Sequence, residues 1–76
     1  SGTGMSMTAN KYKGIRAAVC YDEASTRLSR QHNNANIIAL GSRLTKKNKV
    51  FKLIKIFLST KFEGGRHKRR VRKLDV

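Results

Sequence analysis

A histidine and an asparagine stand side by side at positions 32 and 33, between a helix-forming segment and an apolar one. An imidazole carries protons near neutral pH, and a carboxamide N–H stabilises a developing oxyanion. In a loop that borders a cleft, His32 and Asn33 would therefore suit proton transfer coupled to stabilisation of negative charge. The same pair is also typical of a plain helix end, where asparagine closes the helix and the histidine is solvated.

The first four residues, Ser1, Gly2, Thr3 and Gly4, lead into a segment that suits a short helix. Glycines let the backbone approach a ligand closely, and the first N–H groups of a helix attract anions. The segment therefore predicts a loop that holds an oxyanion or a phosphate. The alternative is a flexible chain end, because short glycine patterns are common.

Three arginines are candidates for binding phosphate. Arg66 and Arg70 are four residues apart, so one face of a helix would present both to a single phosphate. Arg43 directly follows an apolar segment, a position at which α/β proteins place ligand contacts beyond the carboxyl ends of their strands. The alternative for the last residues is a solvated basic tail.

The overall charge also favours phosphate ligands. The 76 residues carry 18 Lys and Arg against 4 Asp and Glu, a net charge of +14, and 13 of the 18 cations lie within residues 43–76. Nonspecific nucleic-acid binding is one function that fits this charge. Few aromatic side chains accompany the cations, which weakens that alternative, since single-stranded nucleic acid is held largely by stacking on aromatic rings.

The remaining reactive side chains suggest little chemistry. Cys20 is the only cysteine, so it forms no disulfide within the chain, and its apolar neighbours predict a small buried side chain rather than a nucleophile. With two histidines in the chain we expect no zinc cluster. His67 lies in the basic run without a carboxylate close in sequence, and no role is assigned to it.

Alternating helix and strand patterns must position these residues. Apolar runs predict buried strands at residues 15–21 and 36–40, which suit a parallel sheet. Helices are expected at residues 23–31, capped by Asp22 with Ala24 and Leu28 on the face opposite Arg27 and Arg30, and at 49–58, capped by Thr45. In the latter, Val50, Leu53, Ile54, Phe57 and Leu58 form the apolar face. After a turn at residues 63–65, residues 66–74 predict a short last helix.

Two strands are too few for a stable doubly wound sheet, because both would leave unpaired edges. The pattern therefore predicts an incomplete α/β domain, with residues 1–76 as the C-terminal half of a single domain. No apolar run approaches the roughly 20 residues that span a bilayer, and no signal-peptide core is present, so a cytoplasmic protein without a membrane partner is expected.

Six segments together resemble the type B ribose-5-phosphate isomerases, a family that includes the LacAB-type galactose-6-phosphate isomerases. In order along the chain they are SGTGMS at 1–6, ANK at 9–11, GIRAA at 14–18, SRQHNNAN at 29–36, GSR at 41–43 and FEGGRHxxR at 62–70. The resemblance implies a Rossmann-like α/β/α sandwich with a parallel sheet, of which about two strands and three to four helices are present here. It also implies isomerisation between aldose and ketose phosphosugars through an enediolate, without a metal or other cofactor.

The resemblance also implies a role for each candidate residue. Gly2, Thr3 and Gly4 would stabilise the oxyanion through their backbone N–H groups, with the Ser1 hydroxyl near the sugar. His32 would help to open the sugar ring, and Asn33 would lie beside the developing charge. Arg43, Arg66 and Arg70 would hold the phosphate. Family members are dimers or tetramers with active sites between protomers, so we expect a homodimer or homotetramer.

The chain departs from the family pattern in one respect that bears on activity. Family members carry a cysteine or a glutamate directly before the glycine loop, where it transfers the proton, whereas this sequence starts at Ser1. Cys20 does not occupy that position. We therefore expect the complete protein to be active and the 76-residue chain alone to be inactive. Association with another chain through an open sheet edge is a third possible function.

Overall fold

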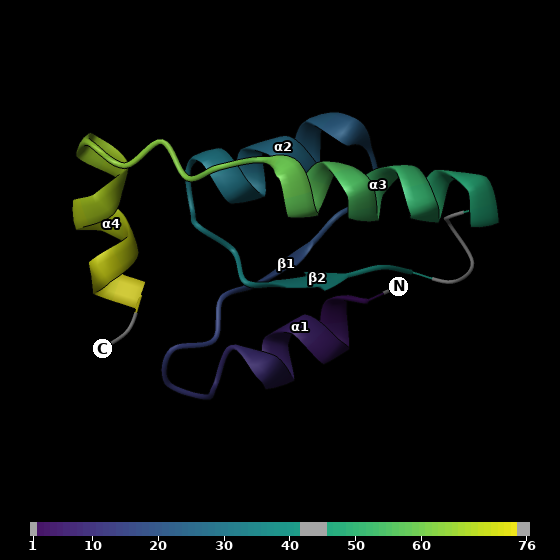
Figure 1. Cartoon of the computed structure of the whole chain (residues 1–76). Coiled ribbons are helices and arrows are strands. Elements are labelled where there is room, and N and C mark those ends of the chain that lie inside the picture. The colour runs from purple at the N-terminus through teal and green to yellow at the C-terminus, as the bar shows by residue number, and fades with distance from the viewer. Residues whose placement is uncertain (1, 42–45, 75–76) are drawn as a thin grey trace.

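The computed structural model describes residues 2–41 and 46–74 of the chain. Four helices and two strands follow one another in the order α1, β1, α2, β2, α3, α4 (Figure 1). Their bounds are α1 Thr3–Ala9, β1 Ala17–Val19, α2 Glu23–Gln31, β2 Ile37–Ala39, α3 Lys47–Ser59 and α4 Arg66–Leu74. Among these residues, no helix is both long and apolar enough to cross a bilayer.

The two strands form a parallel sheet in which Ala17 pairs with Ile37 and Val19 with Ala39. Helix α1 lies on one face of this sheet, while α2 lies on the other face with α3 packed beside it (Figure 1). Helix α4 stands apart at the end of the sheet where the strands begin. The predicted α/β architecture with a parallel sheet is thus confirmed.

Both strands are shorter than the apolar runs predict, and asparagine side chains bind the backbone near the start of β1 on both of its edges. The Asn10 carboxamide accepts from the Ala17 N–H at 2.7 Å and donates to the Ala17 carbonyl at 2.9 Å, on the edge of β1 that faces away from β2. On the other side, Asn36 Oδ1 accepts from the Arg16 N–H at 2.8 Å. The expected burial is also incomplete, since Ile37 is 38% exposed in a sheet of two strands.

Helix α2 begins where the sequence predicts. The Asp22 carboxylate accepts from the Ser25 N–H at 2.7 Å, and the Ser25 hydroxyl in turn accepts from the Asp22 N–H at 3.2 Å. These two hydrogen bonds satisfy donors that a helix start leaves without partners. The bonds from Ser25 also lower the pKa of the Asp22 carboxyl.

The buried face of α2 differs from the prediction. Thr26 and Ser29 are buried, whereas Ala24 is exposed and Leu28 is 46% exposed. Both hydroxyls donate to backbone carbonyls one turn back, Thr26 to Asp22 and Ser29 to Thr26, each at 2.7 Å. Because these small side chains satisfy their polar groups locally, they can pack against the sheet, and an apolar pattern cannot reveal them.

Helix α3 buries most of its predicted apolar face. Leu53 is fully buried and Val50, Ile54 and Phe57 are half-buried, but Leu58 is 79% exposed. The predicted cap at Thr45 lies outside the described residues. Leu53 belongs to the small core together with Cys20, Ala35 and Val71. Cys20 is therefore the buried small side chain that the sequence predicts.

Candidate active site

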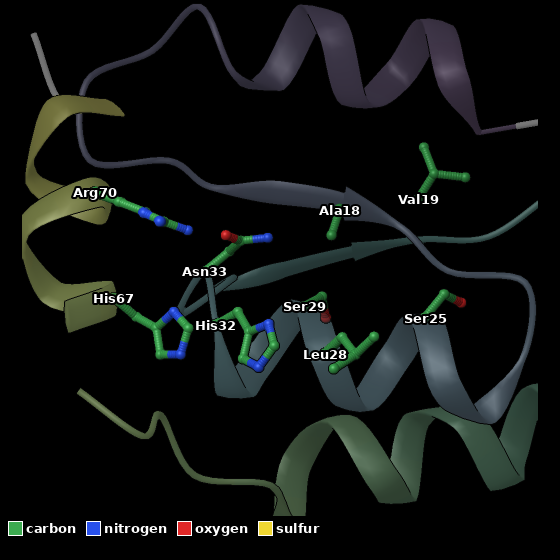
Figure 2. Close-up of a pocket in the computed structure, with 9 residues that line it drawn as sticks. All are labelled: Ala18, Val19, Ser25, Leu28, Ser29, His32, Asn33, His67 and Arg70. Atoms are coloured by element: carbon green, nitrogen blue, oxygen red, sulfur yellow. The ribbon is translucent and has the colours of Figure 1, made fainter. Parts of the chain in front are cut away.

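A hollow of about 320 Å³ opens between β1, the length of α2 and the inner side of α4 (Figure 2). Its polar side chains come from α2 with the two residues that follow it and from α4, whereas β1 contributes only apolar side chains. Its lining residues are Ala18, Val19, Ser25, Leu28, Ser29, His32, Asn33, His67 and Arg70. The structure therefore brings Arg70 together with His32 and Asn33, the adjacent pair that the sequence singles out.

The end of α2 places His32 and Asn33 at the hollow. Helix α2 ends at Gln31, and His32 is the C-cap, its N–H donating to the Leu28 carbonyl at 2.9 Å. Asn34 then adopts a left-handed conformation with a φ of 48° and turns the chain towards β2. The prediction that asparagine closes this helix is correct, and the pair also faces a hollow, so the two interpretations of His32 and Asn33 are compatible.

His67 is the site residue that sequence reasoning missed. Its ring stacks on that of His32, with centroids 4.3 Å apart and planes 12° from parallel, and the residue is only 8% exposed. Glu63 lies against both rings, its Oε1 being 3.8 Å from Nε2 of His32 and 3.7 Å from Nε2 of His67. The statement that no carboxylate lies close to His67 in sequence was wrong, since Glu63 precedes it by four residues, and this spacing was the signal available.

Two contacts hold the segment that carries Glu63 against the end of α2. The Arg30 guanidinium donates to the Thr60 carbonyl at 3.0 Å and to the Ala35 carbonyl at 2.7 Å. The Glu63 N–H donates to the Gln31 carbonyl at 3.0 Å. Residues 60–63 are therefore fixed beside His32, and the two glycines that follow, both at positive φ, turn the chain into α4.

The surroundings of His67 favour its neutral form. Burial lowers the pKa of the imidazole, and the positive charges of His32, Arg66 and Arg70 lower it further, while Glu63 opposes the shift. A neutral imidazole keeps one nitrogen lone pair free to accept a hydrogen bond or to bind a metal.

A second, strongly cationic hollow of about 420 Å³ adjoins the first along α4. Its side chains lie three and four residues apart on one stripe of the helix, and the lining residues are Gly65, Arg66, Arg69, Arg70 and Lys73. Arg70 lines both hollows. The predicted pair Arg66 and Arg70 does share a helix face, and Arg69 and Lys73 add two cations that the sequence analysis did not select.

The glycine segment lies elsewhere. Gly2 has a φ of 85° and precedes α1 at the carboxyl end of β2, where an added Cβ would meet the backbone of Leu40 at 3.3 Å. His32, in contrast, lies near the start of the strands, since the neighbouring Asn34 carbonyl accepts from Arg16 just before β1. Thr3 and Gly4 form the first turn of α1 rather than a loop. Ser1 and Arg43 lie outside the described residues.

The structure also gathers possible metal ligands that the sequence did not suggest. His32, Glu63 and His67 each offer one ligand atom, and these three atoms all lie within 4.8 Å of one another. The expectation of no zinc cluster counted histidines and cysteines alone and did not consider a carboxylate as a third ligand.

Comparison with known proteins identifies the family. The family model described as ribose/galactose isomerase matches residues 1–74. The chain belongs to this family. It is 45% identical over 71 residues to the ribose-5-phosphate isomerase B of Escherichia coli, covering 93% of this chain and 48% of that protein.

Solved structures of ribose-5-phosphate isomerases are similar to nearly the whole of this chain. The Thermotoga maritima ribose 5-phosphate isomerase superimposes with a TM-score of 0.95 at 53% identity, covering 99% of this chain and 52% of that one. The Mycoplasma genitalium ribose-5-phosphate isomerase B, described with bound ribulose 5-phosphate, gives 0.92 at 45% identity and covers 96% and 48% of the two chains. The predicted family is confirmed, the chain spans about half the length of these relatives, and nothing among them supports the nucleic-acid alternative.

Proposed function

We propose that this chain supplies half of a phosphosugar isomerase that interconverts ribose 5-phosphate and ribulose 5-phosphate through an enediolate. The observation that carries the proposal is the single hollow that His32, Asn33 and Arg70 line, with the cationic hollow adjoining it at Arg70. A phosphosugar has the matching polarity, with an uncharged, reactive end and an anionic end.

In this proposal His32 opens the sugar ring. Opening a cyclic hemiacetal removes the proton from the hydroxyl on C1, forms the carbonyl and adds a proton to the departing ring oxygen. A histidine near neutral pH can perform both transfers. The stacked ring of His67 fixes the plane of His32, and the Glu63 carboxylate faces the Nε2 edges of both imidazoles.

Asn33 and the glycine segment stabilise the enediolate. The Asn33 carboxamide lies in the same hollow as His32, where it would donate to an oxygen that gains negative charge. The N–H groups of Gly2, Thr3 and Gly4, with the Ser1 hydroxyl, would do the same from the start of α1.

The phosphate binds to Arg66 and Arg70, joined by Arg43. Forked, charge-assisted hydrogen bonds from two arginines one turn apart would hold one phosphate group. Arg69 and Lys73 lie in the same hollow and add to the attraction.

We infer that the active site forms between two copies of the protein. The glycine segment adjoins the carboxyl end of β2, whereas His32 lies near the opposite end of the sheet. Residues of one site that lie at opposite ends of a protomer meet when a second copy supplies one of the sets. A homodimer or homotetramer in the cytoplasm, with a single domain of which residues 1–76 are the C-terminal half, fits this arrangement.

The proton-transfer base is expected outside this chain. Within residues 2–41 and 46–74 the only thiol, Cys20, is fully buried, and no carboxylate lines the hollow that holds His32. The resemblance to the family places a cysteine or glutamate directly before Ser1. The intact protein is therefore the proposed enzyme, with no metal or organic cofactor, and the 76-residue chain alone is expected to be inactive.

An assay of ribulose 5-phosphate formation from ribose 5-phosphate by the intact protein tests the proposal. Replacing a general acid–base residue costs about 10²- to 10⁴-fold in rate, so His32→Ala should lower turnover by at least about 100-fold. Arg27→Ala, an exposed change on the same helix, is the control and should leave turnover unchanged. Full activity of His32→Ala would refute the role of His32, and an inactive wild-type protein would refute the proposed reaction.

A further inference from the structure

The side chains of His32, Glu63 and His67 lie close together, although the proposed reaction needs only the imidazole of His32. Nε2 of each imidazole lies near the same carboxylate oxygen, Glu63 Oε1, at 3.8 and 3.7 Å. Stacking orients the two rings alike, so both nitrogens reach the same carboxylate. Three donor atoms from α2, the 60–65 segment and α4 are thus gathered within 4.8 Å.

These separations are close to those of a metal site. Zinc bonds of about 2.0–2.2 Å in a tetrahedral arrangement place the ligand atoms about 3.4 Å apart. The two pairs that include Glu63 need to close by only a few tenths of an ångström. The stacked rings aim their lone pairs in parallel, so the half-exposed His32 ring must turn out of the stack to direct its Nε2 at the same ion as His67. The half-exposed Glu63 side chain can follow.

The donor set selects the kind of ion. Two imidazoles and one carboxylate suit Zn²⁺ and other divalent transition ions, whereas Mg²⁺ and Ca²⁺ prefer sites made of oxygen atoms. Three protein ligands leave a fourth position open to water or a substrate hydroxyl. Arg66 and Arg70 help to keep His67 neutral, which leaves its lone pair free, but their positive charges also repel a bound cation. The site therefore fits a reversible ligand better than a permanent one.

We propose that His32, Glu63 and His67 bind one divalent transition-metal ion, with Zn²⁺ as the prototype, and that the bound ion inhibits the isomerase. The inhibition rests on the proposed function: an ion on Nε2 of His32 occupies the nitrogen that would move the proton during ring opening. The ion is therefore an inhibitor that competes for a residue of the site.

Metal titration of the intact protein tests the binding, independently of any activity. Calorimetry with Zn²⁺, and the visible spectrum of added Co²⁺, should show one ion bound per chain in tetrahedral coordination. Glu63→Gln removes a ligand from an exposed position and should weaken binding more than about tenfold. Glu23→Gln is the matched control, because that carboxylate pairs with Lys52 at 3.2 Å away from the hollow, and it should bind as wild type does.

Absence of binding, or equal affinity of the Glu63→Gln and Glu23→Gln proteins, would overturn the site. The second arm measures isomerisation with increasing Zn²⁺: inhibition should be reversed by a chelator, and the inhibition constant should rise in Glu63→Gln by the same factor as the dissociation constant. Binding without inhibition would overturn the inhibitory role. A protein that binds Zn²⁺ yet isomerises no ribose 5-phosphate would refute the proposed function and leave the metal site standing.

Discussion

Arg70 is a side chain that the two hollows share. It lines the hollow that holds His32 and the cationic hollow on α4. In the proposed site, a group in that position would contact the substrate close to both of its ends, so its loss should weaken substrate binding.

Arg70→Ala should raise KM for ribose 5-phosphate by about 10- to 100-fold, since a hydrogen bond to a charged group contributes about 1.5–3 kcal/mol. Arg70→Lys should recover only part of this loss, because an ammonium group lacks the guanidinium fork. Steady-state kinetics of the intact protein, beside the exposed Arg27→Ala, measures the effect. An unchanged KM would remove Arg70 from the phosphate site.

His67 should make the protein more sensitive to acid. Its pKa is lowered in the folded state, so the unfolded chain binds the extra proton first. The stability that neutral His67 contributes is full above the unfolded pKa, about 6.5, and is lost as the pH falls through the lower folded value.

The free energy of unfolding, measured with urea between pH 7.5 and 5, should therefore fall more in wild type than in His67→Gln. NMR of the imidazole carbons should place the titration of His67 below that of an ordinary histidine. A His67 that titrates above the ordinary value would contradict the burial argument.

At the scale of elements, one arginine holds the site together. Arg30 joins the loop after α2 to the end of α3 through the Ala35 and Thr60 carbonyls, and its guanidinium lies 5.7 Å from the centre of the Phe57 ring. Because the 60–65 segment carries Glu63 and leads into α4, this link also fixes where His67 stands.

Arg30→Ala should lower the free energy of unfolding by about 2–3 kcal/mol, because it leaves partly buried carbonyls without donors. It should also reduce turnover, since the stack on His32 loosens. Arg27→Ala, three residues earlier on the exposed side of α2, should change stability by less than about 0.5 kcal/mol. Denaturant titration of both variants makes the comparison, and equal stabilities would show that the link contributes nothing.

Local sequence patterns predicted the helices and strands, but they did not predict the side-chain contacts that pack these elements together. Asp22 marks the start of α2 through its side chain, and the spacing of Val50, Leu53 and Phe57 marks the buried face of α3. The buried face of α2 was wrong, because Thr26 and Ser29 satisfy their own hydroxyls and then pack like small apolar residues. A pattern based on hydrophobicity has no means to detect that exchange.

The candidate site likewise has residues that the sequence could reveal and residues that it could not. His32, Asn33 and Arg70 stand out by residue type and spacing, and they do share a hollow. The meeting of His67, His32 and Glu63 depends on the path of residues 60–65, which Arg30 and the Gln31 carbonyl determine. Such tertiary contacts leave no periodic trace in the sequence. Gly2 at the other end of the sheet is a further consequence of topology.

At the scale of the whole molecule, that separation predicts complementation between copies. In the proposed site, Gly4→Asp would place a negative charge beside the enediolate. It should not disturb the fold, since nothing lies within 4 Å of a Cβ at Gly4. If each site combines the glycine segment of one copy with His32 of another, dimers that mix Gly4→Asp and His32→Ala contain one intact site.

Co-refolding these two inactive proteins in equal amounts should restore about a quarter of wild-type activity, as expected for random pairing in dimers. A mixture of His32→Ala with Arg70→Ala is the control. Because both residues line one hollow, mixing should restore nothing beyond the activity that Arg70→Ala retains by itself. Restoration in the control alone would reverse the assignment of residues to copies, and restoration in neither mixture would place the whole site within one protomer.

The Asn10 carboxamide on the outer edge of β1 has a consequence for handling the protein. An amide side chain that donates to and accepts from one residue occupies the position that a peptide group of an incoming strand would take. Unpaired edges recruit other chains and seed aggregation. Asn10 thus blocks the edge of β1 at Ala17. A strand that extends the sheet there must first displace the Asn10 side chain, whether that strand belongs to the same protein or to another one.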